Sequence, residues 1–212
     1  MKILFIGNSK TYRQNMPLIF KRIVEKSGKD IYIDNVTKPG ASLIELYNEV
    51  ETLKKISSAK WNYVVIQERT IKALQEDISE FKEGAIKLAN AILKNNSATK
   101  IIYQACGVHN DFVIEEYEAT NKHYEQITKL TNGKVCYQGN AFINFHNHFP
   151  EIELYENKQH PTLVGAYLSA CCLYNTIFNE RSSEVEYFDV LNPEIAINVQ
   201  NIADEVCYRG NM

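Results

Sequence analysis

The chain opens with the sequence Lys2-Ile3-Leu4-Phe5-Ile6-Gly7-Asn8-Ser9, and this stretch indicates the class of the fold. Its apolar run ends at a glycine, which is typical of a strand buried on both faces of a sheet. Further strand-like runs of similar length follow along the chain: Ile31–Val36, Tyr63–Gln67, Lys100–Ala105 and Lys134–Tyr137. We therefore expect a sheet of five strands.

Helical patterns separate these strands. Apolar residues recur at steps of three and four between Ile78 and Ile92, which is the period of an amphipathic helix. Asn192 is placed to cap a last helix that starts at Pro193. Other helical segments are predicted at Met16–Val24, Val113–Ile127 and residues 162–178. Strands that alternate with helices predict right-handed crossovers and a parallel sheet covered on both faces, here as a single domain over residues 1–212.

The composition excludes several classes of protein. Hydrophobic residues make up 45% and charged residues 23% of the 212 residues, as in soluble globular proteins. The formal net charge of −3 argues against a nucleic-acid partner. The apolar run Leu163–Tyr174 is shorter than the roughly 20 residues of a membrane span, and the N-terminus lacks the pattern of a signal peptide. The five cysteines form no C-x-x-C pair, so we expect reduced thiols in a cytoplasmic protein without a membrane segment.

Parallel sheets of this kind bind ligands at the carboxyl ends of their strands. The loops that follow the first four predicted strands are therefore the places to look for chemistry. All of them carry small or polar residues: Gly7-Asn8-Ser9, Pro39-Gly40-Ala41-Ser42, Gln67-Glu68-Arg69-Thr70 and Ala105-Cys106-Gly107-Val108-His109.

Ser9 and His160 have the side chains of a nucleophilic centre. Ser9 stands between a strand and a helix, where backbone N–H groups can stabilise a developing oxyanion. His160 precedes an apolar helix, with Pro161 expected as the first helical residue. A histidine can take the proton of a serine near neutral pH. Alone, each residue also fits a plain role, Ser9 as a helix cap and His160 as a surface histidine.

The remaining polar motifs give weaker signals. The two-residue spacing of His146 and His148 does not place both imidazoles on one helical face, so we expect no metal site. His109 follows the fourth strand, where it is either a substrate contact or an ordinary loop residue beside Asp111. Neither a Gly-x-Gly-x-x-Gly nor a Walker-type loop is present, and we expect no cofactor.

Taken together, four segments resemble the blocks of the SGNH (GDSL-like) hydrolase superfamily, in the bacterial branch with Gly-Asn-Ser in its first block. The segments occur in the family's order and span nearly the whole chain: Ile3–Ser9, Pro39–Ser42, Trp61–Glu68 and His160–Leu168. The resemblance implies a flavodoxin-like, three-layer α/β/α sandwich with a five-stranded parallel sheet in the order 2-1-3-4-5. It also implies esterase or lipase activity on acyl or acetyl groups.

The resemblance assigns roles by position. Ser9 matches the nucleophile and His160 the base, while the N–H groups of Ser9 and Gly40 match the oxyanion hole. The family's Gly-x-Asn-Asp block is missing, and the strand ends in Gln67-Glu68 instead. Gln67 is therefore the candidate third donor of the oxyanion hole. Glu68 is a candidate substrate contact, whose carboxylate would repel an oxyanion unless a partner such as Arg69 neutralises it.

Asn157 is the clearest departure from the family pattern. The family has Asp-x-x-His, in which the acid holds the imidazole, and this chain has Asn157-Lys158-Gln159-His160. We assign Asn157 to the catalytic set by its position, and three interpretations stay open. Glu156 or Glu153 takes the place of the acid, a backbone carbonyl orients the ring in a Ser–His dyad, or catalysis is impaired.

These observations predict a serine esterase that acts on small acyl esters, and the family resemblance implies O-acetyl groups on carbohydrates as the favoured class. The alternative is a catalytically impaired protein of the same fold that binds an acylated or carbohydrate ligand. The expected partner is a small ester substrate, without nucleic acid, membrane, metal or cofactor. The sequence predicts no oligomeric state.

Overall fold

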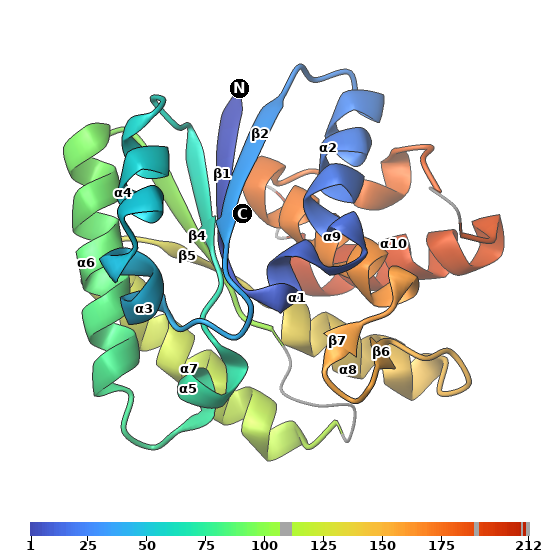
Figure 1. The fold of residues 1–212 in the computed structure, drawn as a ribbon. Coiled ribbons are helices and arrows are strands. Elements are labelled where there is room, and N and C mark those ends of the chain that lie inside the picture. The colour runs from blue at the N-terminus through green and yellow to red at the C-terminus, as the bar shows by residue number, and fades with distance from the viewer. Residues whose placement is uncertain (107–111, 189–190, 209, 211–212) are drawn as a thin grey trace.

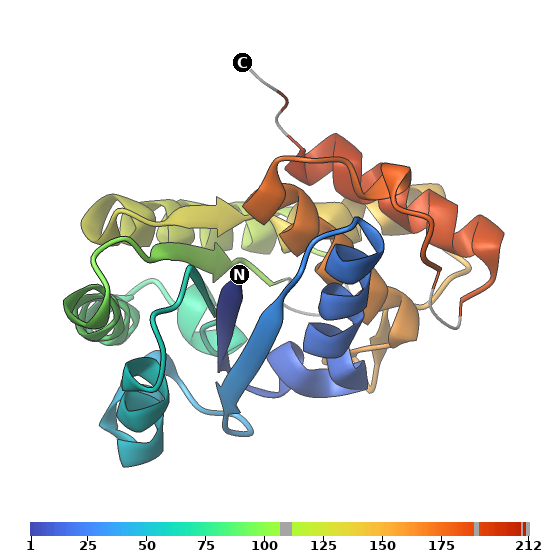
Figure 2. The same cartoon turned by 90° about the horizontal axis from the view of Figure 1, so that it is seen from above.

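The computed structural model describes residues 1–106, 112–188, 191–208 and 210. Within them, a parallel sheet has the strand order β2-β1-β3-β4-β5 (Figures 1 and 2). The strands are β1 (Lys2–Gly7), β2 (Tyr32–Thr37), β3 (Tyr63–Ile66), β4 (Lys100–Gln104) and β5 (Lys134–Cys136). The predicted α/β class and the order 2-1-3-4-5 are confirmed.

Helices cover both faces of the sheet (Figure 2). Alternate residues of β1 enter the two hydrophobic cores, because side chains alternate across a strand: Ile3 and Phe5 pack into one, Leu4 and Ile6 into the other. The first face packs against α2 (Met16–Lys26), α8 (Gln138–His148), α9 (Leu163–Phe178) and α10 (Pro193–Cys207). The second face packs against α3 (Leu43–Asn48), α4 (Val50–Ser57), α6 (Ser79–Asn95) and α7 (Ile114–Thr131).

Several short elements complete the described chain. They are α1 (Ser9–Tyr12), the 3-10 turns Arg13–Asn15 and Ser182–Glu184, α5 (Thr70–Leu74), and a hairpin of β6 (Tyr155–Glu156) and β7 (His160–Pro161). Figure 1 places α1, α5 and the hairpin together below the carboxyl ends of the strands. This is the edge at which the strand–helix alternation predicted a ligand site.

The edge strand β2 differs from the expectation that each strand is buried on both faces. It pairs only with β1 among the described strands, and its residues are half-buried or exposed. An edge strand has a neighbour on one side only, and little of β2 is covered by helices. Four helices that no sequence pattern predicted are α3, α4, α5 and α8.

Helix α9 lies in the centre of one core and is buried at every position from Gly165 to Ile177. A helix that is buried all round has no polar face, which explains why its sequence is one apolar run. Cys171 and Cys172 lie inside it with no exposed surface, as expected for core residues. Among the described residues, no helix combines the length and the apolarity that crossing a bilayer requires.

Candidate active site

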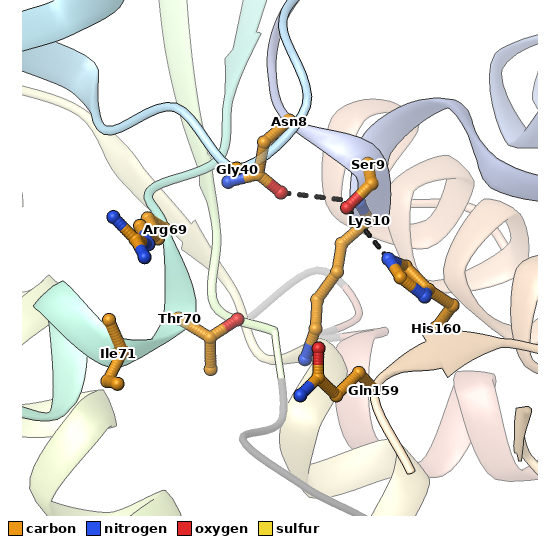
Figure 3. A pocket seen from close by; sticks show the side chains of 9 residues that line it. All are labelled: Asn8, Ser9, Lys10, Gly40, Arg69, Thr70, Ile71, Gln159 and His160. Carbon is orange, nitrogen blue, oxygen red and sulfur yellow. Dashed lines mark hydrogen bonds between the residues drawn. The ribbon is translucent and has the colours of Figure 1, made fainter. Parts of the chain in front are cut away.

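Ser9 and His160 meet at the carboxyl edge of the sheet. Ser9 is the first residue of α1, directly after β1, and His160 is the first residue of β7. The imidazole Nε2 of His160 lies 3.0 Å from the hydroxyl Oγ of Ser9 (Figure 3). This separation is that of a hydrogen bond in which a serine hydroxyl donates to a neutral imidazole.

A tight turn holds His160 in place. In the β6–β7 hairpin, Glu156 is the register partner of His160, and the N–H of Gln159 donates to the carbonyl of Glu156 at 3.2 Å. Asn157 and Lys158 occupy the two central positions with φ of 52° and 59°, as in a type I′ turn. Asparagine tolerates this left-handed conformation better than most residues.

The helix that follows His160 begins later than expected. Pro161 belongs to β7 and is not the first helical residue. Thr162 is the N-cap of α9, and its hydroxyl accepts from the N–H of Gly165 at 3.2 Å. His160 is therefore held by a short strand between a turn and a helix cap.

Asn157 does not accompany His160, which corrects its assignment to the catalytic set. Its side chain is exposed at the tip of the hairpin, and within the described part of the chain it has no hydrogen bond to His160. The three-residue spacing crosses a tight turn here, so the two residues do not face one another. The backbone conformation explains an asparagine at this position.

Glu156 is the acidic residue beside His160. Register partners in an antiparallel pair project from the same face, and the negative charge of Glu156 raises the pKa of the imidazole. Its carboxylate lies 3.6 Å from the guanidinium of Arg13. Glu153 is exposed, and its contact with this region is a backbone carbonyl that accepts from the hydroxyl of Thr162 at 2.8 Å. No hydrogen bond to the imidazole Nδ1 is present among the described residues.

The surroundings of His160 favour its neutral form. Burial lowers the pKa of the imidazole below its ordinary value of 6.5, and the positive charges of Arg13 and Lys10 lower it further. Glu156 acts in the opposite direction, and the net direction is downward. A neutral imidazole at pH 7 is the form that can accept a proton from a serine.

Gly40 lies across the pocket from His160, in the loop after β2. Its φ of 66° is left-handed, and no atom lies within 4 Å of the place where a Cβ would stand. The side-chain amide of Asn8 donates to the carbonyl of Ala41 at 3.2 Å, which ties this loop to the residue before Ser9. Within the described residues, neither the N–H of Ser9 nor that of Gly40 donates a hydrogen bond. Both residues line the pocket.

Gln67 lies beneath the site and does not line it, so its predicted place in the oxyanion hole is wrong. Its side chain has no exposed surface, and its Oε1 accepts from the N–H of Asn8 at 3.2 Å and from the hydroxyl of Thr11 at 3.1 Å. Its side-chain amide donates to the carbonyl of Glu68. A backbone N–H can only donate, so this orientation of the Gln67 amide is fixed. The residue supports the Ser9 loop from below.

Glu68 is also absent from the pocket wall, which corrects its assignment as a substrate contact. Its carboxylate accepts from the backbone N–H groups of Leu43 at 3.1 Å and Arg69 at 2.5 Å. Burial raises its pKa to about 7. The residue links the start of α3 to the segment after β3. The sequence suggested that the Arg69 guanidinium would neutralise Glu68, but the partners of its carboxylate are backbone amides.

A pocket of about 240 Å³ opens over Ser9 and His160 (Figure 3). Its lining residues are Asn8, Ser9, Lys10, Gly40, Arg69, Thr70, Ile71, Gln159 and His160. Sequence reasoning missed Lys10, Thr70, Ile71 and Gln159 as pocket residues and took Arg69 only as a partner for Glu68. Their positions in the chain could have indicated them, because each lies within three residues of a segment that carries the family resemblance. His109 lies outside the described residues.

The described residues hold no cluster of three or more metal-ligating side chains. His146 lies in α8, where its ring stacks on Phe112 with centroids 4.1 Å apart. This contact gives His146 a packing role.

No family model matches the chain, and a search of curated proteins finds no match. Solved structures do match. A DUF4886 family protein from Bacteroides uniformis has a TM-score of 0.80 at 17% identity, over 97% of this chain and 93% of its own. An acetyl xylan esterase has a TM-score of 0.67 at 15% identity, over 84% and 100%. A family 3 carbohydrate esterase from Clostridium thermocellum has a TM-score of 0.62 at 12% identity, over 84% and 96%.

These similarities establish the class of fold. The strand order and the covering helices are those of solved esterases and of a putative GDSL-like lipase, so the fold is the one that the sequence blocks implied. At identities of 12% to 17%, the similarity concerns the fold, and the chemistry must be argued from the site.

Proposed function

We propose that this protein is a serine esterase that hydrolyses small acyl esters, with O-acetyl groups on carbohydrates as the favoured class. The observation that carries the proposal is the 3.0 Å contact between Ser9 Oγ and His160 Nε2, both of which line a pocket. A hydroxyl bonded to a neutral imidazole is the arrangement that activates a serine.

The proposed reaction has two halves. His160 Nε2 takes the proton of Ser9 as Oγ attacks the ester carbonyl, and the carbonyl oxygen becomes an oxyanion beside the N–H groups of Ser9 and Gly40. His160 then returns the proton to the departing alcohol, which leaves an acyl group on Ser9. A water molecule attacks this acyl-enzyme while His160 again acts as the base, and the acid is released.

Glu156 is the proposed positioning residue for His160. The imidazole becomes positively charged in the transition state, and the carboxylate on the neighbouring strand stabilises that charge. Asn157 is then not required, because the acid is supplied from across the hairpin. Of the interpretations that the sequence left open, this arrangement supports the one with Glu156.

The size of the pocket supports a small acyl group. Its volume of about 240 Å³ is below the range of about 300–1,000 Å³ common for drug-sized ligands. Two structural neighbours are an acetyl xylan esterase and a carbohydrate esterase, which favours acetylated carbohydrates as the first substrates to test. The five buried, unpaired cysteines are consistent with the cytoplasm as our proposed compartment. The proposed partner is a small ester, and we propose no nucleic-acid or membrane partner.

The test combines turnover and labelling. We expect the protein to release p-nitrophenol from p-nitrophenyl acetate and to be labelled at Ser9 by a fluorophosphonate probe. Ser9→Ala abolishes both while the melting temperature stays near that of the wild type. Ser97→Ala is the matched control, because Ser97 is an exposed serine close before β4, at the opposite edge of the sheet. Equal turnover by the Ser9→Ala variant rejects the proposal.

The same experiment distinguishes the alternative of an impaired binding protein. That alternative rests on Asn157 and on the missing Gly-x-Asn-Asp block, and of these Asn157 has a structural explanation at the hairpin tip. A folded wild-type protein that is not labelled, yet binds an acetylated sugar, would favour it.

A further inference from the structure

Both charged side chains that line the pocket are positive. Lys10 and Arg69 line it, and no carboxylate is among its described lining residues. The whole chain has a formal net charge of −3, so the charge of the pocket lining is opposite in sign to the net charge of the protein. The reaction proposed above does not use either cation directly.

Lys10 contributes a charge held inside the protein. Its side chain is 9% exposed, and its ammonium lies 5.3 Å from the centroid of the Tyr155 ring. Burial lowers its pKa to about 8, which leaves it mainly protonated at pH 7. The charge extends from α1, next to Ser9, into the pocket (Figure 3).

Arg69 contributes an accessible charge on another wall. It is exposed and lies with Thr70 and Ile71 at the start of α5, across the pocket from His160 (Figure 3). Its guanidinium makes no salt bridge within 4 Å among the described residues, although its charge contributes to lowering the pKa of Glu45. The nearby Lys72 lies outside the pocket and is paired with Glu80 at 2.8 Å.

We propose that the substrate carries an anionic group, a carboxylate or a phosphate, and that Arg69 binds this group while Ser9 faces the ester. The planar guanidinium of arginine matches the geometry of both anions. The positive charge of Lys10 adds to the attraction from within the wall. This inference deepens the proposed esterase function and rests on it for the identity of the reacting bond.

Two roles of Arg69, general stabilisation of the oxyanion and binding of a substrate anion, predict different effects of its removal. If Arg69 served only to stabilise the oxyanion, its removal would slow neutral and anionic esters by the same factor. If it binds a substrate anion, its removal lowers the preference for the anionic ester. The ratio of the two kcat/KM values therefore separates the possibilities.

The experiment uses matched esters. The substrates are 4-acetoxybenzoate, its neutral analogue 4-acetoxybenzamide, and 4-acetoxyphenyl phosphate. We expect Arg69→Gln to lower the ratio of anionic to neutral kcat/KM about tenfold, the effect of one hydrogen bond to a charged group. The preference also falls as salt is raised from about 0.05 to 0.5 M. The anionic ester whose kcat/KM falls more in the Arg69→Gln variant identifies the preferred anionic group.

Lys94→Gln is the control for net charge. Lys94 is an exposed residue at the end of α6, the end of the helix that lies away from the pocket. Its removal changes the total charge by the same amount and leaves the ratio unchanged. An equal ratio in the wild type and the Arg69→Gln variant overturns the inference, while hydrolysis of the neutral ester leaves the esterase proposal standing.

A binding measurement gives a result even without turnover. Affinities of 4-acetoxybenzoate and 4-acetoxybenzamide are measured by calorimetry on the Ser9→Ala protein and on the Ser9→Ala, Arg69→Gln double variant. We expect the anion to bind about tenfold more tightly, and only when Arg69 is present. Equal affinities, including no measurable affinity for either compound, overturn the inference whatever the outcome for hydrolysis.

Discussion

The Nε2 of His160 lies 3.0 Å from the Oγ of Ser9, although 151 positions separate the two residues in the chain. Tertiary packing brings them together, because β7 contacts α1, the turn Arg13–Asn15 and helix α9. This contact turns two ordinary polar residues into a candidate catalytic pair.

The pH dependence of turnover should report on His160. Because burial, Arg13 and Lys10 lower the pKa of the imidazole, kcat/KM for p-nitrophenyl acetate should rise with pH and reach half its maximum below pH 6.5. Arg13→Gln removes a nearby positive charge, so the midpoint should move to higher pH. NMR titration of His160 in the Ser9→Ala protein checks the assignment. A midpoint at or above 6.5 would contradict the structure.

Glu156→Gln should shift the same midpoint in the other direction. Removing the carboxylate lowers the pKa of the imidazole further, and the loss of its stabilising charge should reduce plateau kcat about two- to fivefold, as for a partly exposed charge pair. Glu156→Asp should restore part of the effect. Glu153→Gln is the control, because the contact of Glu153 with Thr162 is made by its backbone. An unchanged pH midpoint in Glu156→Gln would exclude the positioning role.

Asn157→Asp should not increase activity, although it restores the family spacing Asp-x-x-His. The side chain at 157 is exposed at the hairpin tip, and aspartate also tolerates a φ of 52°. We expect kcat/KM to change by less than about twofold, the scale of an exposed charge. An increase of tenfold or more would show that residue 157 reaches the imidazole.

Gly40→Ala should impair catalysis more than stability. Alanine at a φ of 66° costs about 1–2 kcal/mol, and relaxation of the loop would move the N–H that we propose binds the oxyanion. Loss of such a donor lowers kcat about 10²-fold or more. Gly28→Ala is a matched control, because Gly28 has a φ of 83° and equal open space but lies beyond the end of α2. The two variants should lose similar melting temperature, and only Gly40→Ala should lose turnover.

Glu68→Gln should change how stability depends on pH. Burial raises the folded-state pKa of Glu68 from 4.5 to about 7. Its contribution to the free energy of unfolding is thus present below pH 4.5 and lost as the pH rises through about 7, by up to about 3 kcal/mol. Relative to the glutamine variant, the wild type should lose stability between pH 5 and pH 8. Urea unfolding of both proteins at the two pH values measures this difference, and a constant difference would refute the shift.

The predicted strands agree with the structure to within one residue at each end. Apart from the edge strand β2, each strand is an apolar run that folding buries, and glycine or polar residues at the ends of the run mark where the strand stops. Helices α3, α4, α5 and α8 were not predicted. The first three have at most eight residues, so they carry few apolar repeats and depend on packing and on caps such as the Ser42–Glu45 capping box.

The amino-acid sequence by itself determined the layered α/β class, the edge of the sheet where chemistry belongs, and Ser9 and His160 as a candidate pair. The fold class follows from apolar patterning, and the edge of the sheet follows from the rule that parallel strands end together. The pairing of Ser9 with His160 rests on the family resemblance. Only the tertiary structure decided that Gln67 and Glu68 support the loops from below and that Glu156, not Asn157, accompanies the imidazole. The physical reason is that a side chain's direction depends on its hydrogen-bond partners and backbone conformation, and those partners come from segments distant in the chain.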